Sequence, residues 1–232
     1  MKKIFLLHGW TYSLEKWQNC ISRLQKAGYD IIALRVPGLT TTIDKAWELN
    51  DYVSWLHAIL AKEKGKPILI AHSNGGRIAI AFAAQYPHMV EKLILIDSAG
   101  IYHKEIPILI KRFVFSKLAR AGKLLTSSKE IQHIFYKLVG EHDYLNAPSL
   151  SVRQTLRNLI AIDCTPYLTR LRIPTLIIWG EKDTITPLRD GELMKSLIQQ
   201  SKLVIVKNSR HAPYHTHTQE VVDVIVKELQ HI

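Results

Sequence analysis

Hydrophobic residues in this chain recur in two patterns that alternate along most of its length. Short, continuously apolar runs rich in Ile, Leu and Val are typical of strands buried on both faces of a parallel sheet. They occupy residues 3–7, 30–36, 67–71, 92–96, 174–179 and 202–206. Apolar residues at helical spacing predict helices over 14–27, 51–63, 188–200 and 219–230, and one more between Gly76 and Pro87. This alternation predicts an α/β protein whose parallel sheet is covered by helices on both faces.

One interval, residues 101–168, breaks the alternation. It contains no convincing strand, only helical patterns interrupted by prolines and glycines, namely Pro107, Gly122, Gly140 and Pro148. We therefore predict a single α/β core made of residues 1–100 and 169–232, with residues 101–168 inserted between its fourth and fifth strands as a helical segment.

Length and cysteine content narrow the protein class. A chain of 232 residues can bury the core of one sizeable domain, and no apolar run approaches the ~20 residues needed to span a bilayer. The opening "MKKIFLLHGW" has only four apolar residues in a row, fewer than the roughly 7–15 of a signal peptide, so we predict a strand there. Cys20 and Cys164 are too few for a disulfide framework, and we expect buried thiols and a cytoplasmic location.

The chain is basic, with a formal net charge of +11. No nucleic-acid-binding motif accompanies this charge, so a solvated lysine-rich surface is the favoured interpretation and no nucleic-acid partner is expected. Residues 101–160 hold ten basic and four acidic residues. A cationic, amphipathic insertion suits a fatty-acyl or anionic substrate, or transient contact with a membrane surface; a solvated outer face is the favoured alternative.

Polar residues follow the predicted strands at their carboxyl ends, where ligands bind in an open parallel sheet. His8, Gly9 and Trp10 follow the first strand, and Ser73 follows the third. The fourth strand is followed by Asp97, the fifth by Asp183, and the sixth by His211. A serine, a carboxylate and a histidine therefore occur in the chain order that the hydrolase triad uses.

Four segments at these strand ends resemble those of the α/β-hydrolase fold superfamily, and the likeness covers nearly the whole chain. "LLHGW" resembles the family's oxyanion-loop motif, and "AHSNGG" resembles its G-x-S-x-G nucleophile elbow, with Ala71 in place of the first glycine. "LIIWGEKDTITP" resembles the turn that carries the acid, and "SRHAPY" resembles the loop that carries the histidine. "RVPGLTTT" departs from the family's DxPGxGxS segment.

The resemblance implies a mostly parallel, doubly wound sheet with a helical lid at residues 101–168. The family usually has two strands before the HG strand, one of them antiparallel, whereas the HG motif here begins at His8. We therefore expect a sheet of six parallel strands, with the 30–36 strand exposed at one edge.

The same resemblance implies a serine hydrolase with the triad Ser73, Asp183 and His211. A serine hydroxyl is a poor nucleophile at neutral pH, so His211 would accept its proton and Asp183 would orient the imidazole. Asp97 also ends a strand and stays an alternative acid. An ordinary strand-to-helix turn is the alternative interpretation of Ser73.

The developing oxyanion needs hydrogen-bond donors that are already in place. The backbone N–H groups of Trp10 and Asn74 are the candidates for this oxyanion hole. His8, Gly9 and Gly75 are expected to support the site, His8 as a hydrogen-bonding neighbour and Gly75 by allowing the helix to approach the sheet closely.

We expect hydrolysis of a carboxylic ester or thioester through an acyl-enzyme, with a small or medium acyl chain. The alternatives are a C–C bond hydrolase, a lipid or peptide hydrolase of the same fold, and a ligand receptor on a hydrolase scaffold. No cofactor is expected. His211, His215 and His217 lie close together in the sequence, but Pro213 interrupts them and no carboxylate or thiolate pattern completes a site, so no metal is predicted.

Overall fold

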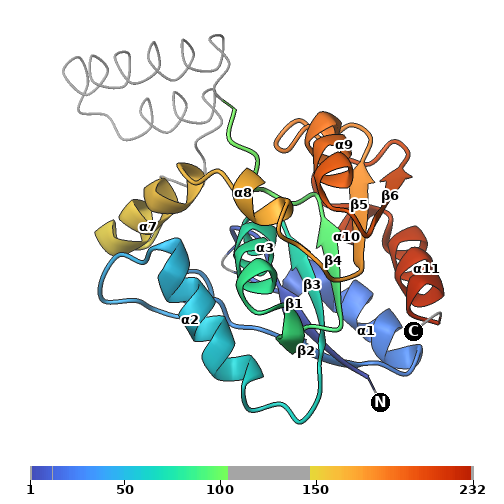
Figure 1. Cartoon of the computed structure of the whole chain (residues 1–232), viewed down its shortest axis with the longest axis horizontal. Helices are drawn as coiled ribbons and strands as arrows, with labels where there is room; N and C mark the ends of the chain where they lie inside the picture. The colour runs from blue at the N-terminus through green and yellow to red at the C-terminus, as the bar shows by residue number, and fades with distance from the viewer. Residues whose placement is uncertain (1, 12, 104–146, 231–232) are drawn as a thin grey trace.

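The computed structural model describes residues 2–11, 13–103 and 147–230, and its centre is one six-stranded sheet (Figure 1). The strands are β1 (Lys3–Leu7), β2 (Asp30–Ala33), β3 (Ile68–His72), β4 (Lys92–Ile96), β5 (Thr175–Gly180) and β6 (Ser201–Val206). Their order is β2-β1-β3-β4-β5-β6, and all five pairings are parallel. The predicted sheet of six parallel strands, with the 30–36 segment at an edge, is confirmed.

The edge strand β2 is shorter than its apolar pattern predicted. It ends at Ala33, although the apolar run continues to Val36. Leu34 and Val36 are buried at 6% and 0% exposure and belong to the core on the side of α2 (Leu49–Leu60). Leu34 and Val36 pack into the core although they lie beyond the end of the β2 ladder. Their apolar pattern therefore reflects burial and does not indicate a strand.

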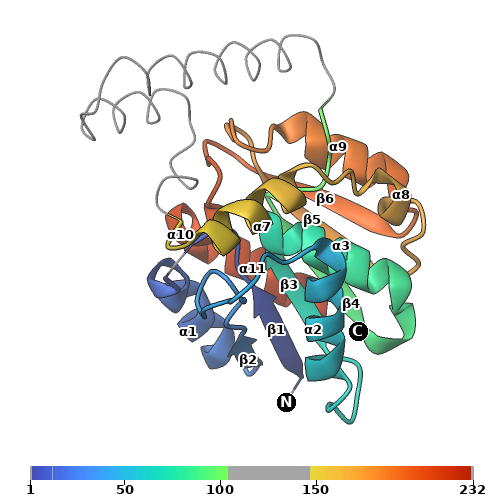
Figure 2. The same cartoon turned by 90° about the vertical axis from the view of Figure 1, so that its left-hand side faces the viewer.

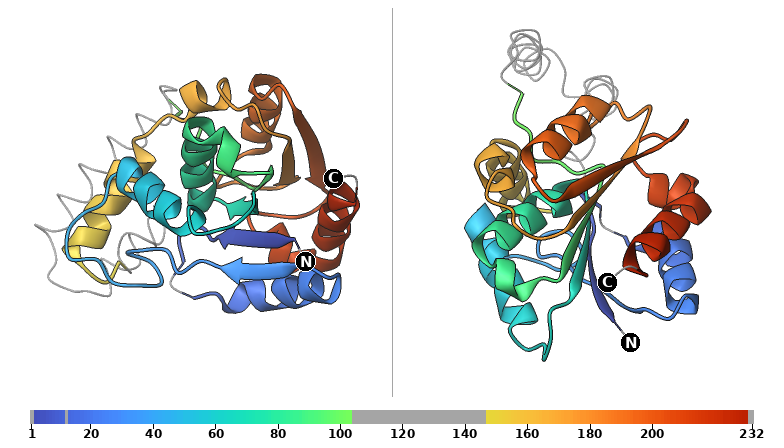
Figure 3. Two further views of the ribbon diagram at one scale, coloured as in Figure 1. Left: turned by 60° about the horizontal axis from the view of Figure 1, so that its bottom comes forward. Right: turned by 45° about the vertical axis from the view of Figure 1, so that its right-hand side comes forward.

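Helices cover both faces of the sheet (Figure 3). One face carries α1 (Gln18–Lys26), which follows the short turn η1 (Glu15–Trp17), and α11 (Thr218–Leu229). The other face carries α2, α3 (Asn74–Gln85) and α9 (Leu188–Leu197). The remaining described helices are the short η2 (Pro87–Met89), α7 (Leu150–Ile160), α8 (Thr165–Leu168) and α10 (Pro213–Thr216).

The strands alternate their side chains between the two cores. In β3, Ile68 and Ile70 join the core under α1 and α11, whereas Leu69 and Ala71 join the core under α2 and α3. All five residues of β3 are buried. This double burial is the physical reason for the continuous apolar run, and the strand order places β3 in the middle of the sheet.

The described end of the insertion that leads into β5 is helical. Residues 147–168 include α7 and α8, whereas residues 101–103 belong to no helix or strand. Figure 2 shows α7 crossing the molecule beside the segment that leads into α2, and Trp47 N–H donates to Thr155 Oγ1 of α7 at 2.8 Å. The rest of the insertion lies outside the described residues. It includes five of the basic residues that make the insertion cationic, namely Lys111, Arg112, Lys117, Arg120 and Lys123.

Cys20 and Cys164 are buried thiols, as predicted, and they lie in the cores on opposite faces of the sheet. Burial raises the pKa of Cys20 to about 12 and that of Cys164 to about 11, so both are protonated at neutral pH. Within the described part of the chain, no helix has the length and apolarity that crossing a bilayer requires.

A buried ion pair ties the last helix to the sheet at the end remote from Ser73. Lys92, at the start of β4, has a side chain only 6% exposed and contacts Glu228 Oε1 of α11 at 2.6 Å. Lys202 of β6 contacts the other oxygen at 3.0 Å. Burial opposes ionisation of Glu228, but the hydrogen bonds from both lysines outweigh it and lower its pKa.

Glu228→Gln is expected to lower the free energy of unfolding by about 1–2 kcal/mol at pH 7, because Lys92 then stays buried without its counter-charge. Because the folded pKa of Glu228 lies below its usual value, this contribution is present above that usual value and is lost as the pH falls through the folded one. Urea titrations at pH 7 and pH 3 measure both effects. Glu220→Gln, at an exposed acid of the same helix, is the control; an equal loss in both variants would contradict the assignment.

Candidate active site

Ser73 occupies a sharp turn between β3 and α3. Its φ of 51° and ψ of −121° lie in a region that a non-glycine residue rarely adopts. Three backbone hydrogen bonds hold it there: its N–H donates to Ile96 at 3.2 Å, and its carbonyl accepts from Gly76 and Ala99, both at 2.9 Å. The surrounding structure therefore enforces a strained conformation that projects the hydroxyl above the carboxyl end of the sheet.

Gly75 allows α3 to approach the sheet closely. A Cβ at this position would lie 2.5 Å from the Leu7 carbonyl oxygen and 2.6 Å from that of His8. The predicted close approach is therefore present, but it is made to the end of the neighbouring strand β1 rather than to β3. Any side chain here would push the start of α3, and Ser73 with it, away from the sheet.

Three residues from distant parts of the chain form a continuous hydrogen-bonded relay. His211 Nε2 lies 3.0 Å from Ser73 Oγ, and His211 Nδ1 lies 2.7 Å from Asp183 Oδ2. Because an ionised carboxylate can only accept, Nδ1 carries the proton and Nε2 is left to accept from the serine hydroxyl. The structure thus brings Ser73, Asp183 and His211 together in one chain of hydrogen bonds.

Asp183 is held as a carboxylate by four hydrogen bonds. Its Oδ1 accepts from the N–H groups of Ile185 at 2.8 Å and Thr186 at 3.1 Å. Its Oδ2 accepts from His211 Nδ1 and from Thr186 Oγ1, both at 2.7 Å. Burial opposes its ionisation, but these hydrogen bonds outweigh burial and lower the pKa of Asp183. The negative charge is therefore present at neutral pH beside the imidazole.

Asp97, the alternative acid, lies behind the relay rather than in it. Its side chain is fully buried, and its Oδ1 accepts from the Gly180 N–H at 2.7 Å. Its Oδ2 is buried without a hydrogen-bond partner among the described residues. Burial, together with the nearby charge of Asp183, raises the pKa of Asp97 to about 8. Asp97 is therefore mostly protonated at neutral pH, and Asp183 is the carboxylate that bonds to His211.

The HG loop lies beside Ser73. His8 is fully buried, and burial lowers its pKa. Its Nδ1 donates to the Gly9 carbonyl at 2.8 Å and its Nε2 accepts from Thr40 Oγ1 at 3.1 Å. His8 thus links the loop after β1 to the "RVPGLTTT" segment, and its supporting role at the site stays a prediction.

The two predicted oxyanion donors lie on elements that flank Ser73. Asn74 is the first residue of α3, so its N–H has no acceptor within the helix and is available at the helix N-terminus. The Asn74 side chain accepts from Arg77 at 2.9 Å. Trp10 is half-buried in the loop after β1 and packs against the core on the α3 side. The assignment of these two N–H groups as an oxyanion hole stays a prediction.

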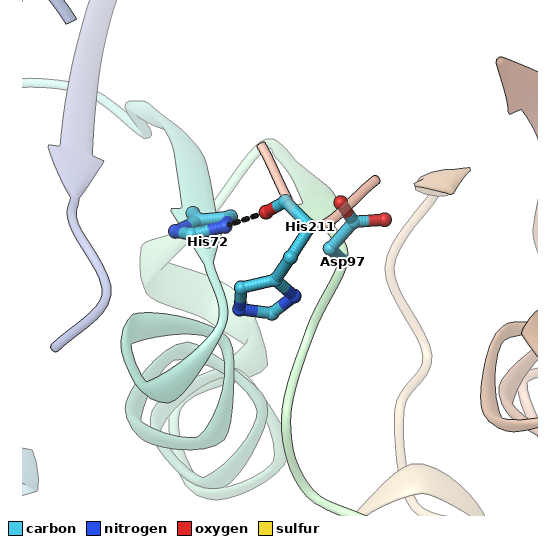
Figure 4. A group of neighbouring side chains, drawn as sticks. All are labelled: His72, Asp97 and His211. Carbon is cyan, nitrogen blue, oxygen red and sulfur yellow. Dashed lines mark hydrogen bonds between the residues drawn. The ribbon is translucent and has the colours of Figure 1, made fainter. Parts of the chain in front are cut away.

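Two further residues of the site were not identified from the sequence. Thr186 donates to Asp183 and contacts His211 Nδ1 at 3.2 Å, and His72 contacts the His211 carbonyl oxygen through Nε2 at 2.8 Å (Figure 4). A hydroxyl three residues after a candidate acid, and a histidine directly before a candidate nucleophile, are the only sequence signals of these roles. Neither signal specifies which atoms meet.

Among the described residues, three side chains at the site could each offer a ligand to a metal ion, and this group differs from the histidines noted in the sequence. His72, Asp97 and His211 each offer a ligand atom, and these atoms lie within 4.8 Å of one another (Figure 4). The hydrogen bonds already described use His72 Nε2 and both nitrogens of His211. The arrangement therefore fits a hydrogen-bonded network better than a set of converging metal ligands.

The chain is similar in sequence to proteins that are named as hydrolases and esterases. It is 28% identical over 252 residues to the AB hydrolase superfamily protein YisY of Bacillus subtilis, with 97% of this chain and 91% of that protein covered. It is 23% identical to the pimeloyl-[acyl-carrier protein] methyl ester esterase of Neisseria meningitidis, with 94% and 90% covered. The solved structure of an esterase from Exiguobacterium antarcticum matches with a TM-score of 0.76 at 19% identity, over 99% of this chain and 92% of that one, and supports the fold.

The model of one protein family, described as the alpha/beta hydrolase family, matches residues 4–224. The match includes all six strands, except for the first residue of β1, and the three segments that carry Ser73, Asp183 and His211. The four sequence motifs, the parallel sheet and this match agree, and the chain belongs to the alpha/beta hydrolase family.

Proposed function

We propose that this protein is a serine hydrolase that cleaves a carboxylic ester or thioester through a covalent acyl-enzyme. The observation that carries the proposal is the relay from Ser73 Oγ through His211 to Asp183, with distances of 3.0 and 2.7 Å. Ester hydrolysis is further supported by the name of the methyl ester esterase that shares 23% identity over nearly the whole chain.

In the first half of the reaction, Ser73 Oγ attacks the carbonyl carbon of the substrate while His211 Nε2 accepts the hydroxyl proton. The carbonyl oxygen becomes an oxyanion, which the N–H groups of Trp10 and Asn74 stabilise, helped by the N-terminal end of the α3 dipole. The tetrahedral intermediate then collapses. The bond to the leaving alcohol or thiol breaks, and His211 returns the proton to that group.

In the second half, water attacks the acyl-enzyme and His211 Nε2 accepts a proton from it. Collapse of the second intermediate releases the carboxylic acid and returns the proton to Ser73. Asp183 stays ionised throughout. It keeps the imidazole in one tautomer and stabilises the imidazolium that forms in each half-reaction, which its low pKa favours.

Ser73→Ala is expected to lower kcat/KM for nitrophenyl acetate, butyrate and octanoate by about 10⁴-fold or more, because it removes the nucleophile. Ser196→Ala, at an exposed hydroxyl of α9, is the matched control and is expected to keep full activity. A fluorophosphonate probe is expected to label Ser73, as located by mass spectrometry. Tight binding of these esters with less than one turnover per chain would instead favour a ligand receptor.

Asp183→Asn is expected to lower kcat by about 10³–10⁴-fold, since an amide can donate to Nδ1 and stabilise the wrong tautomer. Asp97→Asn is expected to keep kcat within about fivefold, because the Asp97 side chain is already mostly neutral at pH 7 and bonds to Gly180 rather than to His211. Steady-state kinetics of the two variants decide between the acids. A larger loss in Asp97→Asn would transfer the role to Asp97.

Asp97 also makes stability depend on pH. Between the usual pKa of 3.8 and the folded value of about 8, the folded chain keeps a proton that the unfolded chain releases. Stability from this residue is therefore fully present below the usual pKa and is lost as the pH rises through the folded value. The fall in thermal midpoint between pH 5 and pH 8 is expected to be smaller in Asp97→Asn than in wild type or in the exposed-site control Asp44→Asn. Identical slopes in all three would contradict an uncharged Asp97.

A further inference from the structure

His72 links the loop that carries His211 to the strand that carries Ser73. It is the last residue of β3 and directly precedes Ser73, whereas His211 lies 138 residues beyond Ser73 in the irregular segment between β6 and α10. The ring of His72 contacts the backbone of His211, with Nε2 at 2.8 Å from the carbonyl oxygen (Figure 4). A carbonyl oxygen can only accept, so His72 Nε2 carries the proton.

The ring of His72 cannot turn away from this hydrogen bond without disrupting its surroundings. The residue is 6% exposed, and edge-on aromatic contacts join its ring to Tyr214 at 4.8 Å and to Trp17 at 6.0 Å between ring centroids. Trp17 and Tyr214 in turn stack on each other at 3.5 Å. In the loop after the neighbouring parallel strand β1, a Cβ at Gly9 would lie 2.7 Å from His72 Nδ1, so only glycine leaves room for the ring.

His72 is also neutral under working conditions. Burial, with a further contribution from the neighbouring His211, lowers the pKa of His72 to about 3. The two imidazole rings lie 4.9 Å apart. In the proposed reaction His211 becomes a cation twice, and an uncharged neighbour at this distance avoids the like-charge repulsion that a protonated His72 would create.

We propose that His72 is a positioning residue for His211: its Nε2–H holds the His211 backbone so that the imidazole reaches Ser73 and Asp183 at the same time. The proposal rests on the hydrolase function proposed above. It assigns a task to a side chain that touches neither the substrate nor the reacting atoms. The hydrogen bond attaches the His211 loop to the end of β3, in the centre of the sheet. It therefore resists a displacement of the loop that would move the His211 imidazole away from Ser73.

The test compares His72→Gln with His72→Met, side chains of similar length of which only the glutamine has an N–H donor. His72→Gln is expected to keep kcat for nitrophenyl butyrate within about threefold of wild type. His72→Met is expected to lower kcat by about tenfold or more while KM changes less than twofold, because the base is displaced but the substrate contacts stay. His72→Phe, which keeps an aromatic ring against Tyr214 and Trp17, is the second variant without a donor and serves if the methionine variant does not fold.

Trp17→Phe is the control for a general loss of packing. It weakens the same aromatic cluster without removing the hydrogen bond, so it is expected to lower the thermal midpoint but to keep kcat within about twofold. Equal kcat in the glutamine variant and in the donor-free variants would overturn the positioning role. So would a loss in Trp17→Phe as large as that in His72→Met.

A second readout does not depend on turnover. The proton between His211 Nδ1 and Asp183 gives a downfield NMR signal when the imidazole is held in place, and this signal is expected in wild type and His72→Gln but broadened in His72→Met. If wild type fails to hydrolyse the esters, the proposed function fails and the NMR comparison still tests the positioning. If wild type is active and the signal is equally sharp in all three proteins, the positioning proposal fails and the function stands.

Discussion

A single imidazole ring must satisfy two hydrogen bonds at once, and the arrangement of the carboxyl end of the sheet follows from that requirement. His211 comes from the loop after β6, Ser73 from the turn after β3 and Asp183 from the loop after β5. In a parallel sheet these ends meet at one rim, so three segments that are distant in sequence can converge without any long excursion of the chain. The tolerance is narrow, since both contacts are hydrogen bonds of 3.0 Å or less.

Close backbone approach is what makes this convergence possible. Gly75 lets α3 begin against the carbonyl oxygens at the end of β1, and Gly9 leaves room for the ring of His72. Both glycines act on the elements around Ser73 rather than on the reacting atoms. The strained backbone of Ser73 is held by hydrogen bonds to Ile96, Gly76 and Ala99, so the energy stored in the turn is balanced by the central strands and the helix they support.

Local surroundings decide which titratable groups at the carboxyl end of the sheet carry a charge. Asp183 is ionised because four hydrogen bonds outweigh its burial. The neighbouring Asp97 accepts only one N–H and mostly keeps its proton at neutral pH. His72 is buried and neutral beside His211. One carboxylate is thus left to balance the positive charge that forms on His211 in the proposed reaction, and the other titratable groups packed around it stay uncharged.

The amino-acid pattern was enough to predict the six strands, their parallel arrangement and the residues at their ends, because double burial requires continuous apolar runs and glycine-rich turns mark where strands stop. It also indicated Ser73, Asp183 and His211, because these residues follow the third, fifth and sixth strands in the chain order of the family that the four motifs resemble. Three features required the three-dimensional structure: β2 ends at Ala33, Asp183 rather than Asp97 bonds to His211, and His72 and Thr186 lie at the site. The reason is physical: hydrophobic periodicity reports whether a residue is buried, but which polar atoms meet depends on loop conformations and strand register, and these are set by contacts between residues far apart in the chain.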